Sequence, residues 1–133
     1  MQARNNIVVD CSYIISGMLP DENSELLTMN FGDIYVPALF YLECTNVLLT
    51  RLKRKTITHQ QFQNFIHLLH MMPMIIDHLT ARPLNDIVQL CQEYHLTPYD
   101  ASYLELALRL NTNLLTHDEQ LKKAFLKSRS LYG

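Results

Sequence analysis

The sequence has few of the residues on which several classes of protein depend. Three glycines among 133 residues are too few for a glycine-rich phosphate loop, so nucleotide binding of that kind is not expected. Three cysteines stand at positions 11, 44 and 91 and form no Cys-x-x-Cys pair, which argues against a structural zinc site and a disulfide framework. We expect them to be small buried thiols in a reducing cytosol.

Long apolar runs and a large net charge are missing as well. No apolar run reaches roughly 18 residues and no basic segment opens the chain, so membrane spanning and secretion are not expected. We expect a cytoplasmic location. The net charge of -2 excludes a strongly basic nucleic-acid binder, although a local basic patch can still bind phosphate. The length and the hydrophobic content of 48% are typical of one globular domain, residues 1–133.

Short apolar runs alternate with helical patterns along the chain. Strands are predicted at residues 7–9, 34–36, 74–76 and 114–116, because such runs suit a parallel sheet that is covered on both faces. Helices are predicted at residues 11–15, 21–29, 38–53, 58–72, 82–94, 97–111 and 118–126. A turn is expected at residues 31–33, and residues 127–133 are expected to be too short for much structure. The alternation predicts an α/β fold with a small parallel sheet.

Apolar residues at steps of three and four predict which faces of the helices are buried. The helix at 38–53 is expected to pack through Leu39, Leu42, Thr45, Leu48, Leu49 and Leu52. The helix at 82–94 is expected to pack through Leu84, Ile87, Val88 and Cys91. Residues 97–100 read Thr-Pro-Tyr-Asp, which is typical of a helix start with a capping threonine and an acid three residues later.

Four acids stand where predicted strands end or predicted helices begin. Asp10 follows the first strand, Glu43 lies early in the helix at 38–53, and Asp100 and Asp118 begin two later helices. Each acid alone has a structural explanation, since acids cap helices and favour helix N-termini. Glu43 fits that explanation least, because it has apolar neighbours and no lysine or arginine within four residues. A buried carboxylate without a partner is costly.

The four acids would form one site if they converge at the rim of the sheet. Open parallel sheets bind ligands at the carboxyl ends of their strands. Two carboxylates about 5 Å apart repel each other by about 3 kcal/mol at an effective dielectric of about 20, and a divalent cation compensates that repulsion. Carboxylate oxygens suit Mg²⁺ or Mn²⁺, and both cations pair with phosphate substrates.

Four segments follow one another along the chain: Val8-Val9-Asp10-Cys11-Ser12, Leu42-Glu43-Cys44-Thr45-Asn46-Val47-Leu48, Leu96-Thr97-Pro98-Tyr99-Asp100-Ala101 and Leu114-Leu115-Thr116-His117-Asp118. Taken in this order they resemble the PIN-domain ribonucleases and, within these, look most like the VapC toxins of VapBC toxin–antitoxin pairs. The resemblance extends from Ile7 to about Phe125. It implies a PIN-like sheet of five parallel strands flanked by helices. Because few residues remain after Ser128, the fifth strand is expected to be short or absent, so the sheet is expected to have four or five strands.

The resemblance also implies roles for individual residues. The family's metal-binding and catalytic acids are matched by Asp10, Glu43, Asp100 and Asp118. Surrounding polar residues of the family are matched by Ser12, Asn46 and Thr116, of which the two hydroxyls would orient ligands. We expect Asp10 and Asp100 to be the main metal ligands, with Glu43 and Asp118 completing the shell or orienting water.

The implied activity is cleavage of RNA that leaves a 5′-phosphate and a 3′-hydroxyl, with Mg²⁺ or Mn²⁺ activating water. The resemblance further implies a homodimer and an antitoxin protein that blocks the active site. Candidate RNA-binding residues are Arg51, Lys53, Arg54, Lys55 and His117. The four basic residues are explained equally well as a solvated helix end.

Other classes of function fit less well. A catalytically silent PIN module that binds protein or RNA would keep the fold, but the presence of all four acids favours the enzyme. A phospho-receiver domain needs an adjacent acidic pair near its start, whereas Asp10 stands alone. A phosphatase with an aspartyl nucleophile needs a second acid where Ser12 stands. A metal-free ribonuclease that uses histidines as acid and base is also disfavoured, because the histidines are scattered, and His67 and His70 are expected on the polar face of one helix.

Overall fold

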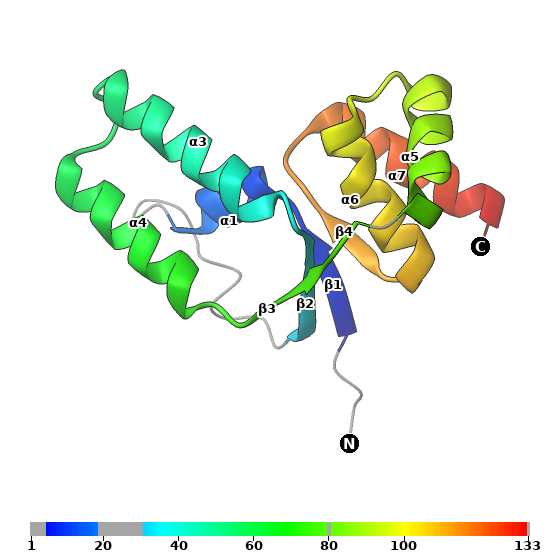
Figure 1. The fold of residues 1–133 in the computed structure, drawn as a ribbon, viewed down its shortest axis with the longest axis horizontal. Helices are drawn as coiled ribbons and strands as arrows, with labels where there is room; N and C mark the ends of the chain where they lie inside the picture. The colour runs from blue at the N-terminus through cyan, green and yellow to red at the C-terminus, as the bar shows by residue number, and fades with distance from the viewer. Residues whose placement is uncertain (1–4, 19–30, 80, 133) are drawn as a thin grey trace.

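A parallel four-stranded sheet flanked by six helices makes up the described part of the protein, residues 5–18, 31–79 and 81–132 of a computed structural model (Figure 1). The strands are β1 (Asn5–Val9), β2 (Phe31–Pro37), β3 (Met74–Asp77) and β4 (Asn113–Leu115). The helices are α1 (Cys11–Met18), α3 (Phe40–Lys53), α4 (His59–Met71), α5 (Ala81–Tyr94), α6 (Pro98–Leu110) and α7 (Glu119–Tyr132). The predicted α/β fold is confirmed, and the helix predicted at residues 21–29 lies outside the described residues.

The sheet has the order β3-β2-β1-β4, and every pair of neighbouring strands is parallel. Val8 in the central strand β1 stands opposite Tyr35 of β2 and Leu114 of β4. Just past β1, the backbone N–H of Asp10 donates to the carbonyl of Leu115 at 3.2 Å. The carboxyl ends of β1 and β4 are therefore joined at the rim where ligands of such sheets bind.

The helices form two groups on the two sides of the sheet (Figure 1). Helices α3 and α4 pack together on one side, whereas α6 packs against α5, α7 and strands β1, β2 and β4 on the other. Helix α6 starts as predicted, because the Thr97 hydroxyl accepts the N–H of Asp100 at 3.2 Å, and it ends at Asn111 in the left-handed conformation. None of the helices in the described ranges combines the length and the apolar character needed to cross a bilayer.

The predicted buried faces of α3 and α5 are wrong in part. The buried residues of α3 are Phe40, Cys44 and Leu48, a single row at four-residue spacing, whereas Leu42 and Leu49 are 76% and 49% exposed. On α5, Ile87 and Leu90 are buried, whereas Leu84 and Val88 are about half exposed. Both helices have apolar residues on more than one face, so the sequence pattern alone did not decide which row packs against the sheet.

Two predicted boundaries are also wrong. Helix α7 runs to Tyr132 instead of ending near residue 126, because the buried Ser128 hydroxyl donates to the carbonyls of Ala124 at 2.8 Å and Phe125 at 3.1 Å. A serine whose hydroxyl donates to carbonyls of its own helix can lie within that helix without ending it. Residues 31–33, predicted as a turn, belong to β2. The pairing with β1 is irregular there, because the step from Asn5 to Ile7 in β1 matches the longer step from Phe31 to Ile34 in β2.

Candidate active site

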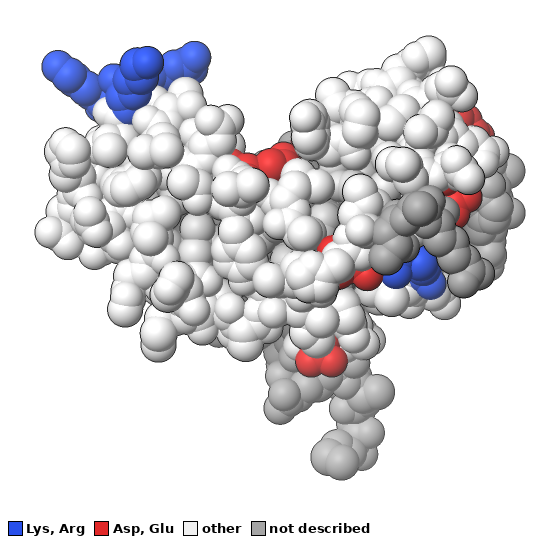
Figure 2. All heavy atoms as spheres, in the orientation of Figure 1, with Lys and Arg blue, Asp and Glu red and all other residues white. Residues whose placement is uncertain are grey.

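Four acids from four separate parts of the chain line one cavity of about 250 Å³. Asp10 directly follows β1, Glu43 lies on α3, Asp100 lies in the first turn of α6, and Asp118 directly precedes α7. Figure 2 shows acidic side chains in the hollow between the α3 side and the α6 side of the molecule. The structure therefore brings the four predicted acids to one place, as the convergence of strand ends and helix starts led us to expect.

Asp10 is held in a fixed orientation by three hydrogen bonds. The Ser12 hydroxyl donates to Oδ1 at 2.7 Å, and the backbone N–H of Tyr13 donates to the same oxygen at 3.0 Å. The Thr116 hydroxyl donates to Oδ2. Asp10 is also buried. Ser12 and Thr116 were predicted to orient ligands, and in the structure both contact this acid directly.

The β1–α1 and β4–α7 connections are tied together around the same hydroxyls. The backbone N–H of His117 donates to the Ser12 hydroxyl at 3.1 Å, and the N–H of Asp118 donates to the Thr116 hydroxyl at 3.0 Å. The Asp118 carboxylate accepts the N–H of Leu121 at 2.9 Å and so caps α7. Asp118 is exposed, so it combines this capping role with a place at the open side of the cavity.

Glu43 has a partner that the sequence analysis did not find. The hydroxyl of Tyr103, which lies 60 residues further along the chain, donates to Glu43 Oε1 at 2.9 Å. Burial raises the pKa of Glu43; the hydrogen bond from Tyr103 partly offsets this, and nearby Asp100 and Asp10 raise it further. The one available signal for Tyr103 was its spacing, because it follows Asp100 by one helical turn and so shares its face of α6.

The other acids also affect the pKa of Asp100. Burial raises the pKa of Asp100, and the charges of Asp118 and Asp10 raise it further, while a hydrogen bond with Thr97 lowers it. Among the described residues that line the cavity, Arg51 is the one lysine or arginine, and no ion pair joins it to an acid. The cavity therefore gathers like charges whose repulsion disfavours full ionisation.

The donor set of the cavity suits a hard divalent cation, because it consists of carboxylate oxygens with hydroxyls behind them. Within the described ranges, no group of three or more histidine, cysteine, aspartate or glutamate side chains is placed to hold a metal ion. Mg²⁺ is commonly bound by one or two carboxylates together with water and substrate phosphates. The residues thus fit a cation that one or two carboxylates hold together with water or a substrate phosphate, and they do not form a closed structural site.

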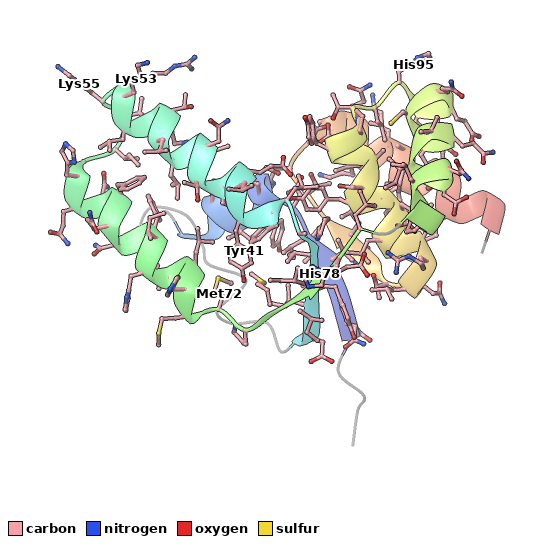
Figure 3. The ribbon with its side chains drawn as sticks, in the orientation of Figure 1. Tyr41, Lys53, Lys55, Met72, His78 and His95 are labelled. Atoms are coloured by element: carbon pink, nitrogen blue, oxygen red, sulfur yellow. The ribbon has the colours of Figure 1, made fainter. Side chains whose placement is uncertain are left out.

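The other predicted site residues are divided between the cavity and the surface. Arg51 lines the cavity wall, whereas Asn46 is exposed and does not line it. The exposed residues Lys53, Arg54 and Lys55 lie at the far end of α3 and the turn after it, where Figure 2 shows a basic cluster. Figure 3 shows the labelled Lys53 and Lys55 pointing away from the cavity, so the predicted basic group is divided between the cavity wall and the surface.

His117 is exposed and stacks on Tyr13, with ring centroids 5.1 Å apart and an interplanar angle of 19°. The remaining histidines do not line the cavity, and Figure 3 places His95 at the turn between α5 and α6 and His78 just after β3. Their distribution gives no support to a metal-free acid–base site.

The cysteines are free thiols; Cys11 and Cys44 are buried as predicted, whereas Cys91 is only partly buried. A hydrogen bond with Cys11, followed by burial, raises the pKa of the Cys44 thiol far above its ordinary value. Cys44 therefore remains protonated and inert, because the thiolate is the reactive form.

Comparison with known proteins identifies the family. Residues 7–125 match the PIN domain family model. The chain is 28% identical to Ribonuclease VapC3 of Pyrobaculum aerophilum over 123 residues, which cover 90% of this chain and 94% of VapC3. The fold is shared with Mycobacterium tuberculosis VapC20, a sarcin-ricin loop cleaving toxin (TM-score 0.67, 14% identity, 89% of this chain and 94% of that one). It is also shared with FitAcB from Neisseria gonorrhoeae (TM-score 0.63, 15% identity, 90% and 92%). Since the family match covers most of its length, the chain belongs to the PIN domain family.

Proposed function

We propose that this PIN domain is a divalent-metal-dependent endoribonuclease and the toxin of a toxin–antitoxin pair. The observation that carries the proposal is that Asp10, Glu43, Asp100 and Asp118 line one cavity and that, among the described residues, none of them forms an ion pair. Membership of the PIN family and the likeness to a protein named Ribonuclease VapC3 support it. The likeness in fold to the toxin VapC20 agrees with the second part of the proposal.

Each acid contributes to the reaction from its observed place. When bound, Mg²⁺ or Mn²⁺ would polarise the scissile phosphate and activate water. Asp10 and Asp100 would hold the cation, and Asp10 needs no reorganisation because its two oxygens are already fixed by Ser12 and Thr116. Glu43 would complete the shell from α3, and the exposed Asp118 would orient water at the open side.

Arg51 would bind the RNA backbone close to the acids. Its side chain lines the same cavity, and a guanidinium recognises phosphate oxygens in a forked geometry. Lys53, Arg54 and Lys55 lie further along the surface and would contact only RNA that extends beyond the cavity. His117, next to Asp118 in sequence, would contact a neighbouring nucleotide through its exposed ring.

An antitoxin protein that covers the cavity is part of the proposal, because the chain resembles VapC toxins. The predicted homodimer remains a prediction, and light scattering on the purified protein tests it. The cytoplasm remains the expected location.

The decisive experiment is cleavage of a labelled RNA pool with Mn²⁺, with Mg²⁺ and with EDTA. We expect cleavage only with the cation, and we expect Asp100→Asn to lose it. Asp86→Asn, which changes an exposed acid of α5 away from the cavity, is the matched control and should cleave like the parent. Cleavage that survives EDTA or Asp100→Asn would refute the metal-dependent site. Binding of RNA or protein without any cleavage would instead favour the catalytically silent PIN module.

A further inference from the structure

Tyr103 lies on the same side of α6 as Asp100 and lines the same cavity. The two residues are one helical turn apart, which puts their side chains side by side. Only 1% of Tyr103 is exposed, and its ring is part of the hydrophobic core. Packing therefore fixes the ring, and the ring fixes the hydroxyl that donates to Glu43 Oε1 at 2.9 Å.

Fewer hydrogen bonds from the described residues hold the carboxylate of Glu43 than hold that of Asp10, so each bond matters more for Glu43. The Asp10 carboxylate receives three hydrogen bonds, from two hydroxyls and one backbone N–H, and both of its oxygens are engaged. Among the described residues, Tyr103 is the one donor to the Glu43 carboxylate, and it engages only Oε1. Glutamate also has one more rotatable bond than aspartate, so more freedom is lost when its carboxylate is fixed.

The chemistry of a buried phenol suits this task. A tyrosine hydroxyl is protonated at neutral pH because its ordinary pKa is about 10, so it can donate to a carboxylate. A phenol carries no positive charge, so it orients the carboxylate without neutralising it. On the same helix, Arg109 does the opposite, because it forms an ion pair with Glu105 at 2.8 Å.

We propose that Tyr103 is a positioning residue that holds the Glu43 carboxylate on the cavity wall by Oε1 and leaves Oε2 and the negative charge for a divalent cation. The role of the cation rests on the proposed function. The placement of Glu43 by Tyr103 does not, so the two claims fail separately.

The first test needs no metal. Crystal structures of the parent, Tyr103→Phe and Tyr35→Phe are compared; each substitution removes one hydroxyl and keeps the ring. Tyr35 lies on β2 away from the cavity, so its variant is the matched control. We expect the Glu43 side chain to leave its rotamer, or to occupy more than one, only in Tyr103→Phe. An unchanged Glu43 in Tyr103→Phe would overturn the proposal whether or not the protein binds metal.

The second test measures the Mn²⁺ dissociation constant from the electron paramagnetic resonance signal of free Mn²⁺. Loss of an orienting partner typically weakens metal affinity about 10- to 100-fold, which we expect for Tyr103→Phe and not for Tyr35→Phe. If Tyr103 acts through Glu43, adding Tyr103→Phe to Glu43→Gln should cause no further loss. Parental affinity in Tyr103→Phe, or fully additive losses, would show a merely structural role and overturn the proposal. If the parent binds no Mn²⁺, the proposed function fails, and the crystallographic comparison still decides the placement of Glu43.

Discussion

Acidic side chains form ion pairs near the C-terminal end of helix α6 and form none, within the described residues, at its N-terminal end. At its N-terminal end, Asp100 faces a cavity with three other acids, and none of them forms an ion pair within the described residues. Toward its C-terminal end, Arg109 binds Glu105 at 2.8 Å and Asp77 of β3 at 2.7 Å. The same helix therefore carries one uncompensated acidic cluster and one fully paired network.

The difference distinguishes acids that the fold pairs with a cation from the acids on which the proposed function depends. The buried Glu105 is accommodated because a guanidinium satisfies it, and the network also ties β3 to α6. The cavity acids are held in place by neutral donors, which keep their orientation and leave their charges in place. We infer that the C-terminal network stabilises the fold and that the N-terminal cluster is reserved for a cation and its phosphate partner.

The largest effect should come from Asp10→Asn, which keeps the size of the side chain and removes its charge. Substitution of residues that merely support a metal ligand costs about 10- to 100-fold, so we expect at least about a hundredfold loss of RNA cleavage for the ligand itself. The measurement is the single-turnover cleavage rate across a Mn²⁺ titration. A rate within about tenfold of the parent would remove Asp10 from the site.

Arg109→Met should remove the ion pairs near the C-terminal end of α6 and leave the buried Glu105 without its cation. We expect a loss of about 2 kcal/mol in the free energy of unfolding, less than for a fully buried pair because Arg109 is itself partly exposed. Metal-induced stabilisation should not change. Urea unfolding measures both quantities, and Arg129→Met, which removes an exposed arginine of α7, is the control. If Arg109→Met abolished the metal effect instead, the two ends of α6 would not be independent.

The pH dependence of stability should distinguish the cavity from the network. The pKa values of Glu43 and Asp100 are raised in the folded protein, so just above the ordinary carboxyl range the folded state binds more protons than the unfolded state. Their contribution to the free energy of unfolding therefore falls as the pH rises from about 4 through the raised pKa values. The double variant Glu43→Gln/Asp100→Asn should lose this fall relative to the parent. A parent–variant difference that stays constant with pH would contradict the raised pKa values.

A smaller effect on RNA binding should distinguish Arg51 from the exposed basic residues that follow it. Arg51→Gln should raise the KM for RNA several-fold and reduce the slope of log affinity against log salt by about one, with kcat nearly unchanged. Lys53→Gln, two residues further along α3, should change neither property by a comparable amount, because Lys53 is exposed and points away from the cavity. Equal effects of the two substitutions would mean that the whole end of α3 binds RNA as one surface.

Much of the fold was predictable because its signals are local. The apolar runs of β1 and β4, the Thr97 cap of α6 and the acid that caps α7 are each set by neighbouring residues, and the structure has them as predicted. The end of α7 was not predictable from composition, because Ser128 bonds back within its own helix. The exposed Leu42 shows the same limit, since apolar character does not say which row of a helix meets the sheet.

The four acids of the site could be predicted from the sequence, but the contact between Glu43 and Tyr103 could not. Asp10, Glu43, Asp100 and Asp118 stand at strand ends and helix starts, which parallel topology brings to one rim. The contact between Tyr103 and Glu43 joins residues 60 positions apart, and no local pattern reports such a distance. The separation of Arg51 from its basic neighbours likewise depends on how α3 lies against the cavity.

The central claim is that the four acids form one cation site, and thermal unfolding tests it most directly. The melting temperature is measured with EDTA and with excess Mn²⁺ for the parent and for Asp100→Asn. A cation that binds only the folded state, present at about a hundred times its dissociation constant, adds about 2.7 kcal/mol to the free energy of unfolding. We expect the corresponding rise in the parent and almost none in Asp100→Asn. An equal rise in both proteins, or none in the parent, would contradict the claim.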